Sequence, residues 1–202
     1  MSYKTEQEEF WASEFGNDYI NRNQDYASNI PLFSKVINRT ANVKSIIEFG
    51  CNIGLNLKAL NALLPKCNLT GVEINKNACK FLHEWGKCDV VNESIFDYNW
   101  KQRYDLSMIK GVLIHINPEM LNNVYKKLYD SSNRYILIAE YYNPTPVSIS
   151  YRGHDNKLFK RDFAGEMLDK YSDLALVDYG FQYHRDNYFK KDDLTWFLLE
   201  KK

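Results

Sequence analysis

The sequence feature that most constrains the fold is a short apolar run that passes directly into glycines, at residues 45–56. It reads Ser-Ile-Ile-Glu-Phe-Gly-Cys-Asn-Ile-Gly-Leu-Asn, which is typical of a buried strand, a tight turn and the start of a helix. Gly50 and Gly54 permit backbone angles and close approaches that a side chain would block. Main-chain N–H groups can therefore approach a ligand, and the segment predicts a nucleotide-binding unit.

A second apolar segment, at residues 69–75, carries an acid about twenty positions after the glycines. Glu73 is placed to accept both hydroxyls of a ribose. The dinucleotide fingerprint G-x-G-x-x-G is absent, and Glu48 stands two residues before the first glycine. A carboxylate at this position suits a ligand that carries an ammonium group. It disfavours a dinucleotide, because its charge would repel the diphosphate by about a few kcal/mol at close range. An oxidoreductase of the short-chain dehydrogenase kind is the weaker alternative.

Length and charge limit the classes of protein to consider. A chain of 202 residues suits one α/β domain. The 26 basic residues balance the 26 acidic ones, which disfavours nucleic acid and anionic membranes as partners. The polar N-terminus and the lack of a long apolar run predict a cytoplasmic protein. The four cysteines lack the spacing of a metal site, so no metal is expected.

Strand-like and helix-like segments alternate along most of the chain. Strands are expected at 45–49, 68–73, 87–91, 104–110, 134–140, 174–183 and 194–199, and helices at 6–23, after Pro31, and at 55–64, 77–85 and 118–130. This alternation predicts an α/β protein with a mostly parallel sheet covered on both faces. Ligands of such sheets bind beyond the carboxyl ends of the strands.

With these residues identified, the chain resembles the class I S-adenosylmethionine-dependent methyltransferases, whose first motif is an acid followed by alternate glycines. The resemblance implies a Rossmann-like seven-stranded sheet with the last strand antiparallel. It also implies one domain over 1–202, with an N-terminal helical lid at 1–40 and the core at 41–202. The middle glycine of the motif is Asn52 here, a residue that tolerates left-handed angles.

The resemblance also implies which residues hold S-adenosylmethionine. Glu48 and the glycine-rich turn would hold the methionine end, Glu73 the ribose, and the segment after strand three the adenine. Tyr19 and Arg22, from the N-terminal lid, would contact the cofactor. The predicted cofactor contacts are therefore Glu48, Gly50, Asn52, Gly54, Glu73, Ile74, Ser94, Ile95, Lys110, Tyr19 and Arg22.

Two later segments are candidates for chemistry and acceptor binding. His115 lies in the loop after strand four, where an imidazole of unperturbed pKa about 6.5 could accept a proton from the acceptor, or only position the loop. Residues 140–166 read as a long tyrosine-rich loop with clustered cations, which could bind an anionic acceptor or simply be solvated. The predicted acceptor contacts are Tyr142, Arg152, His154, Lys160 and Arg161.

The opening segment, the loop at 111–118 and the segment after strand five together look like the narrower family of pseudaminic acid biosynthesis-associated methylases. That resemblance implies O- or N-methylation of a nonulosonic acid or related acidic sugar in bacterial surface-glycan biosynthesis. Two alternatives stay open: methylation of another small anionic metabolite, or a non-catalytic protein that binds adenosylmethionine. The protein is expected to be a monomer or homodimer.

Overall fold

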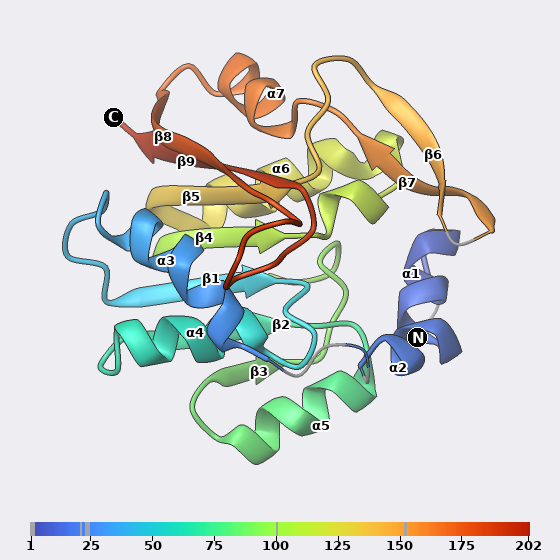
Figure 1. The fold of residues 1–202 in the computed structure, drawn as a ribbon, viewed down its shortest axis with the longest axis horizontal. Coiled ribbons are helices and arrows are strands. Elements are labelled where there is room, and N and C mark those ends of the chain that lie inside the picture. The colour runs from blue at the N-terminus through green and yellow to red at the C-terminus, as the bar shows by residue number, and fades with distance from the viewer. Residues whose placement is uncertain (1–2, 21, 23–24, 100, 152) are drawn as a thin grey trace.

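A central seven-stranded sheet organises the structure, a computed structural model that describes residues 3–20, 22, 25–99, 101–151 and 153–202, apart from the side chains of 154–157. The strand order is β3-β2-β1-β4-β5-β9-β8 (Figure 1). The first five are parallel neighbours, and β9 runs antiparallel to both β5 and β8. The bounds are β1 (Ser45–Phe49), β2 (Asn68–Val72), β3 (Asp89–Val91), β4 (Tyr104–Lys110), β5 (Ser132–Glu140), β8 (Leu174–Gln182) and β9 (Leu194–Lys201). The predicted fold class is confirmed.

Helices cover both faces of the sheet. Alternate residues of each strand face opposite sides, so Ile46 packs with α3 and α4 in one apolar cluster while Ile47 packs with α6 and α7 in another. The helices of the core are α3 (Ile30–Ile37), α4 (Leu55–Leu63), α5 (Lys76–Trp85), α6 (Leu121–Ser131) and α7 (Phe163–Lys170). Strands apolar on both faces can be buried only in this layered arrangement.

Several predicted boundaries have clear local causes in the structure. Gly86 ends α5 in a left-handed conformation, φ 67°, as its sequence position predicts. Pro118 begins a 3₁₀ turn, η3 (Pro118–Met120), and α6 continues from it. Among the described residues, no helix has the length and apolar character needed to cross a membrane.

The N-terminal segment forms two short helices where the sequence analysis predicts one helix over 6–23. They are α1 (Glu6–Ala12) and α2 (Glu14–Ile20), separated by Ser13 in an extended conformation. The close turn needs Gly16, because a Cβ there would lie 1.9 Å from the carbonyl oxygen of Trp11. The side chain of Asn75 donates to that same oxygen at 3.2 Å. The helix pair is thereby bound to the end of β2.

The prediction of a long loop over 140–166 is wrong. Residues 147–160 form an antiparallel hairpin of β6 (Val147–Tyr151) and β7 (His154–Lys160), and α7 follows. The alternation of Val147, Ile149 and Tyr151 with serines is a period-two strand pattern. The preceding prolines favour a loop only up to Pro146. The hairpin stands outside the main sheet, beside α1 (Figure 1).

Candidate active site

A cavity of about 380 Å³ lies at the carboxyl ends of the parallel strands. Gly50 follows β1, Glu73 follows β2, Lys110 ends β4 and Tyr141 follows β5, and all four line the cavity. The helices α1 and α2 contribute Trp11 and Tyr19 from the other side. This is the edge at which open parallel sheets bind ligands.

The glycine-rich turn after β1 takes the left-handed conformations that its sequence predicts. Gly50 has φ 70°, Asn52 has φ 49° and Gly54 has φ 76°. Asn52 supports its own conformation, because its side-chain oxygen accepts the N–H of Ile53 at 2.7 Å. Gly50 and Asn52 line the cavity, whereas Gly54 begins α4 and packs against Leu82. Gly54 therefore shapes the turn and does not face the cavity.

Glu73 is held rigidly at the cavity wall. One carboxylate oxygen accepts the backbone N–H of Asn52 and the other that of Asn75, each at 2.7 Å. Burial raises the pKa of Glu73, and these two N–H groups oppose that shift. Each oxygen keeps a further lone pair. The side chain can therefore accept two hydroxyl groups from a ligand in the cavity.

Glu48 is not where a direct cofactor contact would need it. Its side chain is fully buried and lies outside the cavity lining of the described residues. Asn56 lines the cavity and donates from Nδ2 to Oε1 of Glu48 at 2.5 Å. Burial raises the pKa of Glu48 to about 8, against the opposing effects of Asn56 and Lys110. Asn56 thus lines the cavity, and Glu48 lies behind it as the acceptor of the Asn56 amide.

Buried acceptor atoms and cations gather at this end of the cavity. Within the described residues, the side-chain oxygens Oδ1 of Asn29 and Oδ1 of Asn56 are buried without a hydrogen-bond partner, as is Oε2 of Glu48. Buried acceptors left unsatisfied are costly and point to a missing donor. Lys110 and Lys191 line the same cavity. The site therefore offers acceptors for an ammonium group and cations for a carboxylate.

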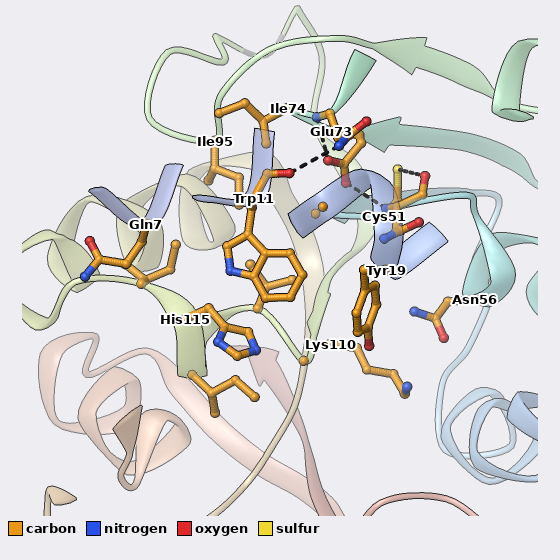
Figure 2. A pocket seen from close by; sticks show the side chains of 18 of the residues that line it. Gln7, Trp11, Tyr19, Cys51, Asn56, Glu73, Ile74, Ile95, Lys110 and His115 are labelled. Atoms are coloured by element: carbon orange, nitrogen blue, oxygen red, sulfur yellow. Dashed lines mark hydrogen bonds between the residues drawn. The ribbon is translucent and has the colours of Figure 1, made fainter. Parts of the chain in front are cut away.

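Aromatic rings surround His115 at the opposite wall. The His115 imidazole lies 4.7 Å from the Trp11 ring and 5.0 Å from the Tyr151 ring, measured between centroids. Figure 2 shows His115 beneath Trp11, with Tyr19 and Lys110 to one side. The imidazole is 7 % exposed and lines the cavity. It can meet a group bound there.

Glu140 fixes the backbone that carries His115. Its carboxylate accepts the N–H of Val112 and of Leu113, each at 2.9 Å, at the start of the 3₁₀ turn η2 (Leu113–His115). Burial raises the pKa of Glu140 to about 7, with these N–H groups opposing. A buried carboxylate at β5 thus determines where the imidazole after β4 lies.

The structure brings most of the predicted cofactor residues together. Those that line the cavity are Tyr19, Gly50, Asn52, Glu73, Ile74, Ser94, Ile95 and Lys110. His115, the predicted catalytic residue, lines it as well. Arg22 lies outside that lining, with its guanidinium 5.0 Å from the Phe15 ring centroid.

The described residues predicted to contact the acceptor lie outside the cavity lining. Arg161 pairs with Glu166 at 2.5 Å, and the Lys160 amine lies 5.1 Å from the Tyr141 ring centroid. The exposed Tyr142 packs on Phe197. None of Tyr142, Lys160 and Arg161 is in the cavity lining of the described residues. Arg152 and the side chain of His154 lie outside the described residues.

Several lining residues were not singled out from the sequence: Gln7, Glu8, Asn29, Asn56, Asn75, Tyr141, Tyr151, Lys191 and Asp192. The i, i+8 spacing of Glu48 and Asn56 across the turn is a signal that could have identified Asn56. Among the described residues, no cluster of three or more histidine, cysteine or acidic side chains is suited to a metal ion.

The fold and the position of the cavity define the Rossmann-like class of methyltransferase folds, and solved structures support this. The structure is similar to a magnesium protoporphyrin IX methyltransferase from Synechocystis with bound S-adenosylhomocysteine, at TM-score 0.67 and 12 % identity over 96 % of this chain and 97 % of that one. No family model and no curated protein matches the sequence.

Two further solved structures show the same fold. An S-adenosylmethionine-dependent methyltransferase from Leishmania major has TM-score 0.73 and 15 % identity, covering 96 % of this chain and 81 % of its own. A 1,6-didemethyltoxoflavin N1-methyltransferase from Burkholderia thailandensis has TM-score 0.68 and 13 % identity, covering 97 % and 87 %. At such identities the likeness concerns the fold.

Proposed function

We propose that the protein is an S-adenosylmethionine-dependent methyltransferase for a small anionic acceptor. One observation carries the proposal: a single cavity is lined by Glu73, whose carboxylate suits a ribose diol, and by Asn29 and Asn56, whose buried amide oxygens lack partners among the described residues and suit an ammonium group. Adenosylmethionine has both groups, whereas a nicotinamide dinucleotide has no ammonium group.

Different residues fit the ammonium group and the carboxylate of the methionine part. Asn29 and Asn56 contribute the buried acceptors for the ammonium group, and Glu48 holds the Asn56 amide through its Nδ2. Lys110 is the cation proposed for the carboxylate. Burial lowers the pKa of its amine, and the nearby carboxyl groups of Glu48 and Glu140 oppose that shift. Glu73 accepts the ribose hydroxyls with the lone pairs that its backbone contacts leave free.

When bound, adenosylmethionine supplies an activated methyl group: the acceptor oxygen or nitrogen bonds to the methyl carbon, the carbon–sulfur bond breaks with its electrons going to sulfur, and the acceptor proton leaves. His115 is the residue proposed to take that proton. The rings of Trp11 and Tyr151 both pack against the imidazole. Orientation can contribute about 7–11 kcal/mol, against about 3–5 for a general base, so His115 accelerates a reaction that alignment already favours.

The acceptor proposed is an acidic sugar of the nonulosonic acid kind, and this rests on the sequence resemblance together with one feature of the cavity. Lys191, from the loop between β8 and β9, also lines the cavity. If Lys110 binds the carboxylate of the methionine part, Lys191 is still available to bind a carboxylate of the acceptor. The cations predicted for this role at 160 and 161 are engaged elsewhere.

Two measurements test the proposal. Calorimetry should show binding of S-adenosylhomocysteine and none of NAD; the reverse result would eliminate a methyltransferase. Incubation with methyl-labelled adenosylmethionine and a panel of acidic sugars, neutral sugars and small carboxylates, followed by mass spectrometry, should show a gain of one methyl group on an acidic sugar. Binding without product on any member would favour a protein that binds the cofactor only.

A further inference from the structure

The N-terminal helix α1 brings a buried carboxylate into the cavity. Glu8 is 8 % exposed and lines the cavity with Ser94, Ile95 and Ile74. The hydroxyl of Ser94 contacts Oε1 of Glu8, and the backbone N–H of Lys4 donates to Oε2 at 2.5 Å. A carboxylate in the wall of a cavity is costly to bury unless donors satisfy it.

The hydrogen bonds at Ser94 decide which group can receive a donor from the ligand. The backbone N–H of Phe96 donates to the Ser94 hydroxyl oxygen at 3.1 Å. The single hydroxyl proton is therefore directed to Glu8, because a carboxylate oxygen can only accept. Each oxygen of Glu8 has one further lone pair, so the carboxylate can accept an N–H group from a ligand.

The surroundings define the shape and polarity of the group that fits there. Ile74 and Ile95 present apolar side chains on the same side of the cavity as Glu73, and Gln7 lies farther out on α1 (Figure 2). If Glu73 holds a ribose, the group that fits beside that ribose is flat. Its apolar faces lie against Ile74 and Ile95, and an N–H donor at its edge faces Glu8. The adenine base with its 6-amino group has this chemistry.

From this geometry we infer that Glu8 accepts an N–H of the adenine 6-amino group and makes helix α1 a determinant of purine specificity. The inference rests on the proposed function, because it needs an adenosyl ligand in the cavity. A base with a 6-oxo group would place a second acceptor against the carboxylate, and such a mismatch is strongly disfavoured in a site built to receive a donor.

The same contacts tie purine recognition to the docking of the helix. Lys4 forms an ion pair with Asp97 on the loop after β3, and the Asn75 side chain holds the Trp11 carbonyl group. Helix α1 is therefore attached at both ends to the loops that line the base. Displacement of the helix removes the acceptor for the amino group together with one wall of the cavity.

Calorimetry with S-adenosylhomocysteine and its 6-oxo analogue S-inosylhomocysteine tests the inference. The natural protein should prefer the adenine compound by at least about tenfold. Glu8→Gln should reduce that preference at least about tenfold, because its amide can donate to a 6-oxo group. Glu9→Gln, one position along at an exposed site of the same helix, should leave the preference unchanged.

Further outcomes separate the possible failures. If the natural protein binds S-adenosylhomocysteine and Glu8→Gln keeps the full preference, the assignment of Glu8 is wrong while the proposed function stands. If the natural protein binds neither compound, the proposed function itself fails. A loss of the preference in Ser94→Ala but not in Glu8→Gln would transfer the role to Ser94. Circular dichroism of each variant should match the natural protein.

Discussion

The carboxylate of Glu73 at the end of β2 accepts the backbone N–H of Asn52 in the glycine-rich turn at 2.7 Å. Glu73→Gln replaces the charged acceptor with an amide, and hydrogen bonds to charged groups contribute about 1.5–3 kcal/mol. We expect the dissociation constant for S-adenosylhomocysteine to rise at least about tenfold, measured by calorimetry. Glu84→Gln, on the exposed face of α5, is the control. Equal affinity in both variants would contradict the ribose assignment.

Lys110 is predicted to bind the methionine carboxylate. Lys110→Met should weaken S-adenosylhomocysteine about tenfold or more and leave 5′-methylthioadenosine unaffected, because the latter lacks the amino-acid part. Lys191→Met should weaken neither compound, since Lys191 is assigned to the acceptor. A loss for both compounds in Lys110→Met would instead indicate a general disturbance of the cavity.

His115→Ala should slow methyl transfer by about 10²–10⁴-fold if the imidazole takes the acceptor proton. The affinity for S-adenosylhomocysteine should change little, because the imidazole is assigned to the acceptor side. Single-turnover rates with an identified acceptor measure the first effect and calorimetry the second. Turnover equal to that of the natural protein would show that His115 only positions its loop.

Two buried carboxyl groups predict how stability depends on pH. Burial raises the pKa of Glu48 to about 8 and that of Glu140 to about 7, from 4.5. Between pH 4.5 and these raised pKa values, the two carboxyl groups bind more protons in the folded state than in the unfolded state. The contribution of the two groups to the free energy of unfolding therefore falls as pH rises. The contribution is fully present below about pH 4.5 and is lost through about pH 7–8.

Glu140→Gln should remove its share of this dependence. Its amide oxygen can still accept the N–H groups of Val112 and Leu113, but it does not titrate. Melting temperatures of both proteins from pH 5 to 8.5 provide the comparison, and the variant should gain relative to the natural protein as pH rises. Parallel curves would show that Glu140 titrates normally.

Two glycines with similar backbone angles separate steric clash from backbone strain. Gly54 has φ 76°, and a Cβ there would lie 2.3 Å from Cδ2 of Leu82. Gly111 has φ 68°, with no atom within 4 Å of a Cβ. Gly111→Ala should cost about 1–2 kcal/mol of folding free energy, and Gly54→Ala distinctly more. Urea unfolding measures both; equal losses would mean that Leu82 moves aside freely.

Much of the fold could be predicted because the strands of a doubly covered sheet are apolar and short. The bounds of β1 and β4 match the prediction, since apolar runs end there at a glycine turn or a lysine. The hairpin β6–β7 was missed because most of β6 is exposed to solvent, which leaves no buried apolar run, and because the neighbouring prolines suggest a loop. The break at Ser13 is accompanied by a hydrogen bond from Asn75 to the Trp11 carbonyl oxygen, 64 positions away in the sequence, which a local pattern does not show.

The site divides in the same way. Glu73 follows from spacing, because the end of β2 fixes its distance from the turn. Glu48 was assigned to the ligand, but a residue one position before a strand's end points toward a helix face, and here it meets Asn56 of α4. Asn29 and Lys191 reach the cavity from a 3₁₀ turn and a distant loop. Only the folded chain brings these residues beside the glycines.

In the described part of the chain, the hairpin β6–β7 forms a two-stranded sheet of its own, and its Tyr151 packs against the ring of His115. The residues proposed to surround the acceptor are thus divided between the main sheet and this separate two-stranded hairpin. Changes of length or side chain in the hairpin are therefore expected to alter which acceptors bind, without changing the residues proposed to bind the methyl donor. Laboratory evolution toward new acceptors should therefore begin there.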